Sequence, residues 1–328
     1  MHQKARVLVA VVSLFVAALS MPVAKTLAAY PACTIQGTSA TETLTGTELA
    51  DIICTGGGND TVNALGGDDI VIVEIGGEVT VDLGSGDDTF DGSDATKATV
   101  NGGDGADEII GSVGNDTLSG GTGVDAISGG DGDDIINGGS DDDELDGDSG
   151  NDTITGDAGD DIIDGGDGGD TLSGSGGDDS IVGGPGGDVL SGDDGSDTLT
   201  GGEGNDRLSG SVGEDDLEGG DGNDSLTGGE DIDQVDGGGG LNYCSMDMSD
   251  VTSSCEWDDF GPAIESIEFS ATTVEVGTSA ATVDVSLHLT DVSGISWFYV
   301  YCYPPSGGQG TQTHDNYQSL NVSWSLLC

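Results

Sequence analysis

Basic residues are nearly missing from this chain of 328 residues, which has 5 lysines and arginines against 63 acidic residues. The net charge of -58 excludes a nucleic-acid-binding protein, because such a chain repels phosphate backbones, and it disfavours contact with anionic lipids. Aromatic residues make up 4% of the chain and 62 residues are glycine, so one ordinary globular core cannot form. With only 6 prolines and no glycine at every third position, collagen is excluded as well. Two possibilities remain, a disordered polyanion or a fold held together without a large core.

The first residues have the pattern of a secretory signal. Lys4 and Arg6 form a short basic start, and an apolar run follows over residues 7–19. That run is too short to span a bilayer, and small residues near Ala28 offer a cleavage site. We therefore predict a signal peptide over residues 1–28 and a secreted, extracellular protein that does not enter a membrane after cleavage. An N-terminal membrane anchor is the alternative.

Most of the chain is one repeat of nine residues. From Gly102 to Asp236 the sequence divides into fifteen units without an insertion. Position 1 is always glycine, position 6 is always aspartate, and position 8 is always Ile, Leu or Val. Position 4 is glycine except at Asp141 and Asp231. Glycines at positions 1, 2 and 4 permit a tight turn with positive φ and close chain approach, and position 8 gives a short strand one inward side chain. The pattern predicts a parallel β-solenoid in which two units form one coil and unit n stacks on unit n+2.

The unit Gly201–Ser209 reads Gly-Gly-Glu-Gly-Asn-Asp-Arg-Leu-Ser. It resembles the RTX, or haemolysin-type, calcium-binding nonapeptide repeat. The resemblance implies an all-β protein with a parallel β-roll over residues 102–245. It also implies calcium ions as cofactor and partner, held between stacked turns by the position-6 aspartates and backbone carbonyls. The implied metal ligands are Asp107, Asp116, Asp125, Asp134, Asp143, Asp152, Asp161, Asp170, Asp179, Asp188, Asp197, Asp206, Asp215, Asp224 and Asp233.

Residues 33–101 form a more degenerate set of repeats and a cap. Asp51, Asp60 and Asp69 occupy position 6 there and are further candidate ligands. The unit Leu83–Asp91 restores the pattern, with aspartate at position 6. Two ten-residue stretches, Val73–Asp82 and Gly92–Asn101, lack it, and we expect them to continue the coil without metal.

Calcium fits this pattern better than other cations. Columns of stacked aspartates repel one another, and a divalent cation removes that repulsion while it links successive coils. Calcium accepts six to eight carboxylate and carbonyl oxygens in flexible geometry, whereas magnesium demands a near-ideal octahedron. Zinc is disfavoured because His2, His288 and His314 are scattered and no cysteine pair has ligand spacing.

Six cysteines fit an oxidising compartment. Solenoids need capped ends, so we predict one disulfide at each end of the repeats, Cys33–Cys54 and Cys244–Cys255. The third predicted pair is Cys302–Cys328, because each of these cysteines shares a strand face with apolar side chains. A metal cluster formed by the cysteines is the alternative.

The composition changes after a capping segment or linker over residues 246–262. Residues 263–328 alternate apolar and polar side chains, as in Val283, Val285 and Leu287, which is typical of antiparallel strands. We predict a small Ig-like antiparallel β-sandwich. The segment supplies about five strands where an Ig-type domain has seven, so we expect an incomplete or minimal domain. The aromatic strand Trp297–Tyr303 forms part of its core or, alternatively, a ligand platform.

The motifs that resemble catalytic sites are explained by the repeat. Gly147-Asp148-Ser149-Gly150 resembles a serine-protease nucleophile, but it is positions 1–4 of one unit and no histidine lies between His2 and His288. We predict that the protein is not an enzyme. It is expected to be an exported calcium-binding repeat protein with a structural, adhesive or matrix-associated role. The alternatives are an accessory fragment of a secreted hydrolase or toxin, and a carbohydrate- or protein-binding module in the C-terminal sandwich.

Overall fold

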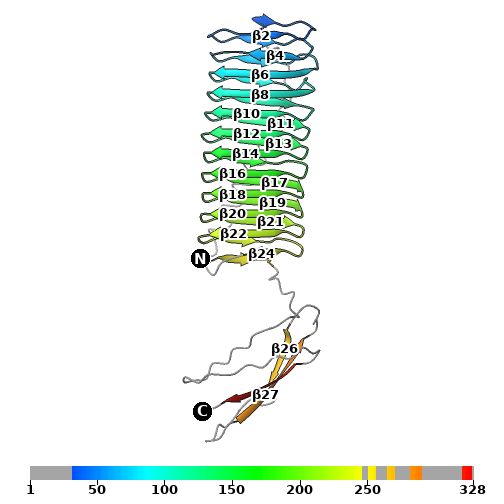
Figure 1. The fold of residues 1–328 in the computed structure, drawn as a ribbon, viewed down its shortest axis with the longest axis vertical. Coiled ribbons are helices and arrows are strands. Elements are labelled where there is room, and N and C mark those ends of the chain that lie inside the picture. Colours follow the sequence, from blue (N-terminus) through cyan, green and yellow to red (C-terminus); the bar gives the residue numbers. More distant parts are fainter. Residues whose placement is uncertain (1–31, 246–249, 256–263, 270–280, 290–319, 327–328) are drawn as a thin grey trace, which may run out of the picture. The chain divides into compact units, whose positions relative to one another are not determined.

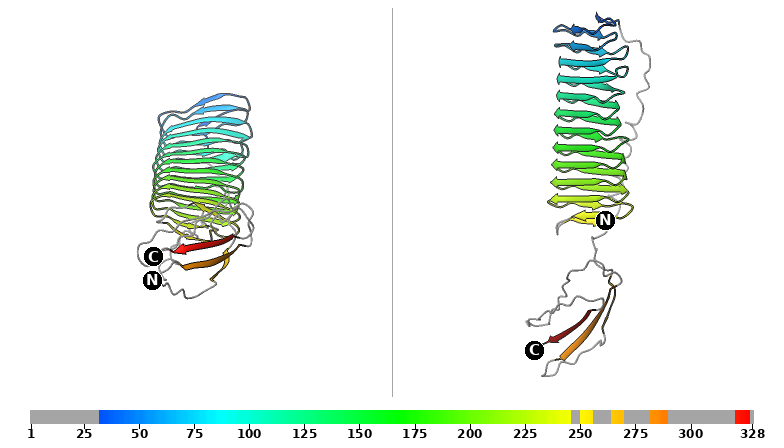
Figure 2. Two further views of the ribbon diagram at one scale, coloured as in Figure 1. Left: turned by 60° about the horizontal axis from the view of Figure 1, so that its bottom comes forward. Right: turned by 45° about the vertical axis from the view of Figure 1, so that its right-hand side comes forward.

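The computed structural model describes residues 32–245, 250–255, 264–269, 281–289 and 320–326. The described residues contain strands and turns and no helix. The chain divides into two compact units, Met1–Ser149 and Gly150–Cys328. Each unit contains a parallel β-solenoid, in which short strands stack side by side in two sheets (Figures 1 and 2). The signal peptide predicted over residues 1–28 lies outside the described residues.

In the first unit, the odd-numbered strands form one sheet and the even-numbered strands form the other. The odd-numbered strands are β1 Ile35–Gln36, β3 Ile52–Cys54, β5 Ile70–Ile72, β7 Thr89–Asp91, β9 Glu108–Ser112, β11 Ala126–Asp131 and β13 Glu144–Ser149. The even-numbered strands are β2 Thr43–Thr45, β4 Asp60–Asn63, β6 Glu78–Ser85, β8 Lys97–Asp104, β10 Thr117–Thr122 and β12 Ile135–Ser140.

The second unit repeats this arrangement. Its odd-numbered strands are β15 Ile162–Asp164, β17 Ser180–Gly186, β19 Thr198–Gly204, β21 Asp216–Asp221, β23 Gln234–Asp236 and β25 Val251–Ser253. Its even-numbered strands are β14 Thr153–Ala158, β16 Thr171–Gly176, β18 Val189–Asp194, β20 Arg207–Val212, β22 Ser225–Glu230 and β24 Tyr243–Ser245.

The register confirms two repeats per coil. In β10 and β12, Leu118 pairs with Ile136, which lies eighteen residues further on. The ten-residue stretches continue the coil, as predicted, and lengthen the step to nineteen, so that Val81 in β6 pairs with Val100 in β8. The extra residue is therefore accommodated without loss of strand pairing.

The core is a ladder of position-8 side chains. Each described repeat from Ile109 to Val235 buries its aliphatic residue, with at most 3% of the side chain exposed. Near the N-terminal end, Phe90 occupies the same position and is fully buried. One inward side chain per repeat forms only a thin core, which leaves room in the turns for the position-6 side chains.

The turn glycines have two separate roles. Left-handed φ values occur at positions 2 and 4, as at Gly202 (113°) and Gly204 (142°). The two residues that replace the position-4 glycine, Asp141 and Asp231, adopt the same conformation, with φ of 80° and 84°. Position 1 does not require positive φ, contrary to our expectation. Its glycine is required by close approach alone, as described below.

The C-terminal part of the chain contains one three-stranded antiparallel sheet in the order β26 (Ile264–Phe269), β27 (Ala281–Leu289), β28 (Leu320–Leu326). Two of the segments expected to be strands are therefore strands, and they are antiparallel. The sandwich itself is not confirmed. The predicted aromatic strand Trp297–Tyr303, Cys302 and Cys328 lie outside the described residues.

Candidate metal-binding turns

The position-6 aspartates lie in the turns just before the strands of both sheets, and their side chains point inward. From Asp107 to Asp233 each is at most 2% exposed. Within each unit, the aspartates of alternate repeats are joined by hydrogen bonds. The backbone N–H of one donates to Oδ1 of the aspartate eighteen or, at Asp88, nineteen residues away, for example from Asp170 to Asp188 at 2.8 Å and from Asp188 to Asp206 at 2.9 Å.

These hydrogen bonds form the two columns expected from the stacking of unit n on unit n+2. In the second unit one column runs Asp152, Asp170, Asp188, Asp206, Asp224 and ends at Asn242. The other runs Asp161, Asp179, Asp197, Asp215, Asp233 and ends at Asp250. In the first unit one column runs Asp51, Asp69, Asp88, Asp107, Asp125 and Asp143.

The second carboxylate oxygen has no hydrogen-bond partner in many of these turns. This buried Oδ2 atom belongs to Asp69, Asp88, Asp107, Asp125, Asp170, Asp179, Asp188, Asp197, Asp206, Asp215 and Asp224. Lys97 and Arg207, the two basic residues among the described residues, are exposed. A buried anionic oxygen without a donor is costly, so the array requires either protons or a bound cation.

The pKa values of the carboxyl groups reflect this cost. Burial raises the pKa of Asp107, Asp170 and Asp179 to about 7. It raises the pKa of Asp69, Asp125, Asp206 and Asp215 to about 6, and neighbouring aspartates add to the effect in most of these turns. The hydrogen bond from the preceding coil acts in the opposite direction but does not offset the burial.

Two oxygen atoms lie close to the position-1 glycine, the partnerless Oδ2 and a backbone carbonyl oxygen of the next coil. A Cβ atom on Gly165 would lie 2.6 Å from Asp170 Oδ2 and 2.7 Å from the carbonyl oxygen of Gly183, one coil further on. Gly183 is placed in the same way between Asp188 Oδ2, at 2.7 Å, and the carbonyl oxygen of Gly201, at 2.6 Å. Two hydrogen-bond acceptors thus converge where position 1 has no side chain. This convergence explains why glycine recurs there, and it marks a place where oxygen atoms meet without a donor.

Asn242 shows what these oxygens accept. It occupies position 6 of the last repeat, Gly237–Ser245, and its Oδ1 accepts the N–H of Asp224 at 2.9 Å as an aspartate would. Its Nδ2 replaces the second carboxylate oxygen and donates to three carbonyl oxygens, those of Gly237 at 2.6 Å, Gly239 at 3.2 Å and Ser254 at 3.4 Å. A positively polarised group therefore fits the ring of carbonyl oxygens around position 6.

Calcium meets the requirements of these turns. Carboxylate and backbone carbonyl oxygens are the ligands that calcium prefers, and its flexible coordination suits a site formed mostly by main chain. A divalent ion beside Oδ2 would satisfy the partnerless oxygen and the carbonyl oxygens together. The residues present therefore fit the ion that the sequence predicts.

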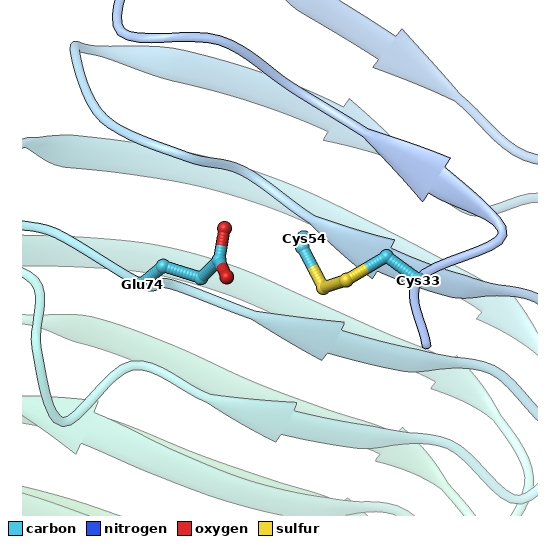
Figure 3. Close-up of side chains that lie close together, drawn as sticks. All are labelled: Cys33, Cys54 and Glu74. Carbon is cyan, nitrogen blue, oxygen red and sulfur yellow. A yellow bond between two sulfur atoms is a disulfide. The ribbon is translucent and has the colours of Figure 1, made fainter. Parts of the chain in front are cut away.

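Among the described residues, the one cluster of three metal-ligating side chains is Cys33, Cys54 and Glu74 (Figure 3). Cys33 and Cys54 form a disulfide with Cα atoms 5.8 Å apart, so their sulfur atoms are not thiolate ligands. Glu74 accepts a hydrogen bond from Gln36 at 2.8 Å. Cys244 and Cys255 form the second disulfide. Both pairings are those expected from the sequence, and this cluster is explained as part of the N-terminal cap.

The degenerate repeats contain one candidate ligand, Asp88, that is not in the predicted ligand set. Asp88 has the same hydrogen bonds and the same partnerless oxygen as the aspartates of the strict repeats. Its position in Leu83–Asp91 was the available signal. Asp88 also changes the expected order of the column. Within the strict repeats alone, Asp107 would be the first aspartate of its column. In the structure Asp107 continues the column of Asp88, whose N–H donates to Asp107 Oδ1 at 2.8 Å.

The other column of the first unit is interrupted where the repeat pattern fails. Val79 and Ala98 stand at the level of position 6, since Asp60 pairs with Val79 and Val79 with Ala98. Both are buried and carry no ligand atom in the side chain. The column resumes at Asp116, whose Oδ1 accepts the N–H of Ala98 at 2.6 Å.

The comparisons with known proteins agree with this geometry. The RTX calcium-binding nonapeptide repeat (4 copies) matches residues 36–72, 101–136, 119–154, 137–172, 173–208, 182–217 and 209–243, which together cover more than half of the chain. No curated protein matches this chain. In the described part of the chain no helix is long and apolar enough to cross a membrane. The chain belongs to the family of RTX calcium-binding nonapeptide repeat proteins.

Proposed function

We propose that this chain is an exported calcium-binding protein whose β-roll folds when calcium binds, and that its role is structural, adhesive or matrix-associated. The observation that carries the proposal is the partnerless Oδ2 atom that recurs in the columns, as in Asp170, Asp188 and Asp206. Calcium would be held by the position-6 carboxylates and the carbonyl oxygens around them. Bound there, the ion supplies positive charge that neutralises the carboxylates and links one coil to the next.

The chain itself contributes three things to this function. The left-handed turns direct carbonyl oxygens toward position 6, and the position-1 glycine leaves space beside Oδ2. In the folded chain the hydrogen bond from the preceding coil fixes Oδ1, so that Oδ2 is the oxygen that faces the place of the ion. The thin core leaves most of the stability to these turns, which is why folding and binding are expected to be coupled.

Circular dichroism with and without calcium tests the coupling. In excess chelator we expect an expanded chain with little β signal. We expect the signal to return at roughly 0.1–1 mM calcium, the range of extracellular modules. Magnesium at the same concentration serves as the control, because it does not easily adopt irregular oxygen coordination. A full β signal in chelator would show that folding does not require the metal.

Export is part of the proposal. The predicted signal peptide over residues 1–28 and the two disulfides support it, because disulfides persist in oxidising compartments. Mass spectrometry of the protein from culture medium would give the mature N-terminus. A chain that stays in the cell and keeps residues 1–28 would contradict export.

We also propose that residues 263–328 form an Ig-like sandwich closed by Cys302–Cys328. The antiparallel pairing of β26, β27 and β28 supports the proposal. Peptide mapping without reduction tests it, and a bond from Cys302 to a cysteine of the roll would contradict it. Binding of this segment to a glycan array would favour a carbohydrate-binding module over a structural role.

A further inference from the structure

Three turns already satisfy their oxygen atoms with donors of the chain. In the repeat Gly111–Ser119, the N–H of Ser112 donates to Asp116 Oδ2 at 2.5 Å and its Oγ donates to Asp116 Oδ1 at 2.9 Å. In the repeat Gly46–Cys54, the N–H and Oγ of Thr47 both donate to Asp51 Oδ2 at 2.8 Å. Except for the Ser112 hydroxyl, these donors reach Oδ2, the oxygen that has no partner in turns such as that of Asp170.

The electrostatics of Asp51 agree with this difference. The hydroxyl of Thr47 is the main cause of a lowered pKa at Asp51, in contrast to the raised pKa of Asp170. In the last turn the donor is the position-6 side chain itself, because the amide of Asn242 donates to the surrounding carbonyl oxygens. In all three turns a hydroxyl or amide group stands where turns such as those of Asp170 and Asp188 lack a donor.

The position-2 backbone separates the turn of Asp116 from another turn with the same residue. Ser112 and Ser175 both occupy position 2. Ser175 has a φ of 79° and its Oγ contacts Ser173 Oγ at 3.2 Å, while Asp179 keeps a partnerless Oδ2. Ser112 is absent from the left-handed region and its side chain is buried against Asp116. The turn conformation, and not the residue type, brings the hydroxyl to the carboxylate.

All three turns lie at the end of a column. Asp51 is the first aspartate of its column, Asp116 is the first after the interruption at Val79 and Ala98, and Asn242 follows the last aspartate of its column. The chain supplies its own donor at these places.

We propose that the turns of Asp51, Asp116 and Asn242 are metal-free ends of the calcium columns, in which Thr47, Ser112 and the Asn242 amide replace the ion. This inference rests on the proposed calcium binding by the other turns. It means that Asp51 and Asp116, although they match the repeat, are not calcium ligands. It also means that the number of calcium ions bound by the chain depends on these three donor residues.

Native mass spectrometry of the full chain in calcium tests the inference, because it counts bound ions. Ser112→Gly converts residues 111–116 to Gly-Gly-Val-Gly-Asn-Asp, the pattern of the metal-binding turns, and should add one calcium ion. Ser175→Gly is the matched control and should leave the count unchanged. Asp116→Ala should also leave the count unchanged, whereas Asp170→Ala should lower it.

Asn242→Asp gives an independent test at the other end and should add one ion. It decides the matter if Ser112→Gly does not fold in calcium. The inference is overturned if Asp116→Ala loses an ion, or if neither Ser112→Gly nor Asn242→Asp gains one while the wild type binds calcium. A wild type that binds no calcium would instead overturn the proposed function.

Discussion

The backbone N–H of Asp170 donates to Oδ1 of Asp188 at 2.8 Å, and Asp188 lies eighteen residues further along the chain. The same bond joins Asp188 to Asp206 and Asp206 to Asp224. Asp188, Asp206 and Asp224 therefore each hold the preceding coil through Oδ1, while Oδ2 has no hydrogen-bond partner. Stability and metal binding depend on the same side chain.

Asp170→Asn separates these two roles. The new amide would keep Oδ1 as an acceptor for Asp152 and, as in Asn242, would donate to nearby carbonyl oxygens. We expect fewer bound calcium ions but a larger β signal in chelator than the wild type gives. Asp170→Ala should lower both. Circular dichroism in chelator and ion counting in calcium measure the two effects, and equal behaviour of the two variants would contradict the prediction.

Acid should partly replace calcium. Burial raises the pKa of Asp107, Asp170 and Asp179 to about 7 from a usual value of 3.8. The folded, metal-free chain therefore binds these protons more tightly than the unfolded chain does. Their contribution to stability is fully present below the unfolded pKa and is lost as the pH rises through about 7.

Titration of metal-free protein from neutral to acidic pH, followed by circular dichroism, checks this sign. The β signal should begin to rise as the pH falls through about 7 and 6, the pKa values of Asp170, Asp125 and Asp206, and should go on rising toward the usual value of 3.8. In calcium the dependence should reverse, because protons compete with the ion for the carboxylates. A metal-free signal that falls with acid would contradict the assignment.

Position-1 glycine should tolerate no side chain. In Gly201→Ala the new Cβ would lie 2.5 Å from the carbonyl oxygen of Gly219 and 2.6 Å from Asp206 Oδ2. We expect a loss of about 1–3 kcal/mol, typical of overpacking, and a weaker calcium midpoint. Gly187→Ala is the control, because the nearest atom to its Cβ would be the Asn205 carbonyl oxygen at 3.7 Å. Thermal unfolding in calcium compares the two, and similar melting temperatures would contradict the close approach.

Loss of the N-terminal disulfide should destabilise the first coils. Cys33 and Cys54 are separated by 21 residues, and cross-links of that size contribute about 3 kcal/mol in chain-entropy terms. In the double variant Cys33→Ser, Cys54→Ser, hydrogen exchange should accelerate in β1 and β3 more than in β18 and β20. Uniform acceleration would mean that the solenoid unfolds as one cooperative unit.

Much of the fold could be predicted because the repeat determines it. The step of eighteen residues, the buried position-8 aliphatics and the inward aspartates all follow from the nine-residue period. Both disulfides of the roll could be predicted because a solenoid must close its ends. Asp88 is missing from the predicted ligand set because the neighbouring ten-residue stretches break the pattern.

Other features depend on geometry that the residue pattern does not contain. The sequence shows serine at position 2 in both Ser112 and Ser175, yet the two backbones differ and only Ser112 reaches an aspartate. The reason for the position-1 glycine also required the structure, since the atoms that exclude a Cβ come from position 6 and from the next coil. The last repeat has Asn242 and not aspartate at position 6, so it departs from the pattern. The contacts of Asn242 nevertheless show which kind of group fits these turns.

The hydrogen bonds along each column have a direction, and that direction has a consequence for synthesis. Oδ1 always belongs to the later residue, so the N–H of Asp152 has no partner of this kind until Asp170 is in place. A chain that emerges from its N-terminus would keep its newest coil unfinished until about one further coil is made. Calcium could not bind in a turn before the following coil is made, so the roll would be completed one coil at a time. Asn242 would end the last step of its column without waiting for another aspartate.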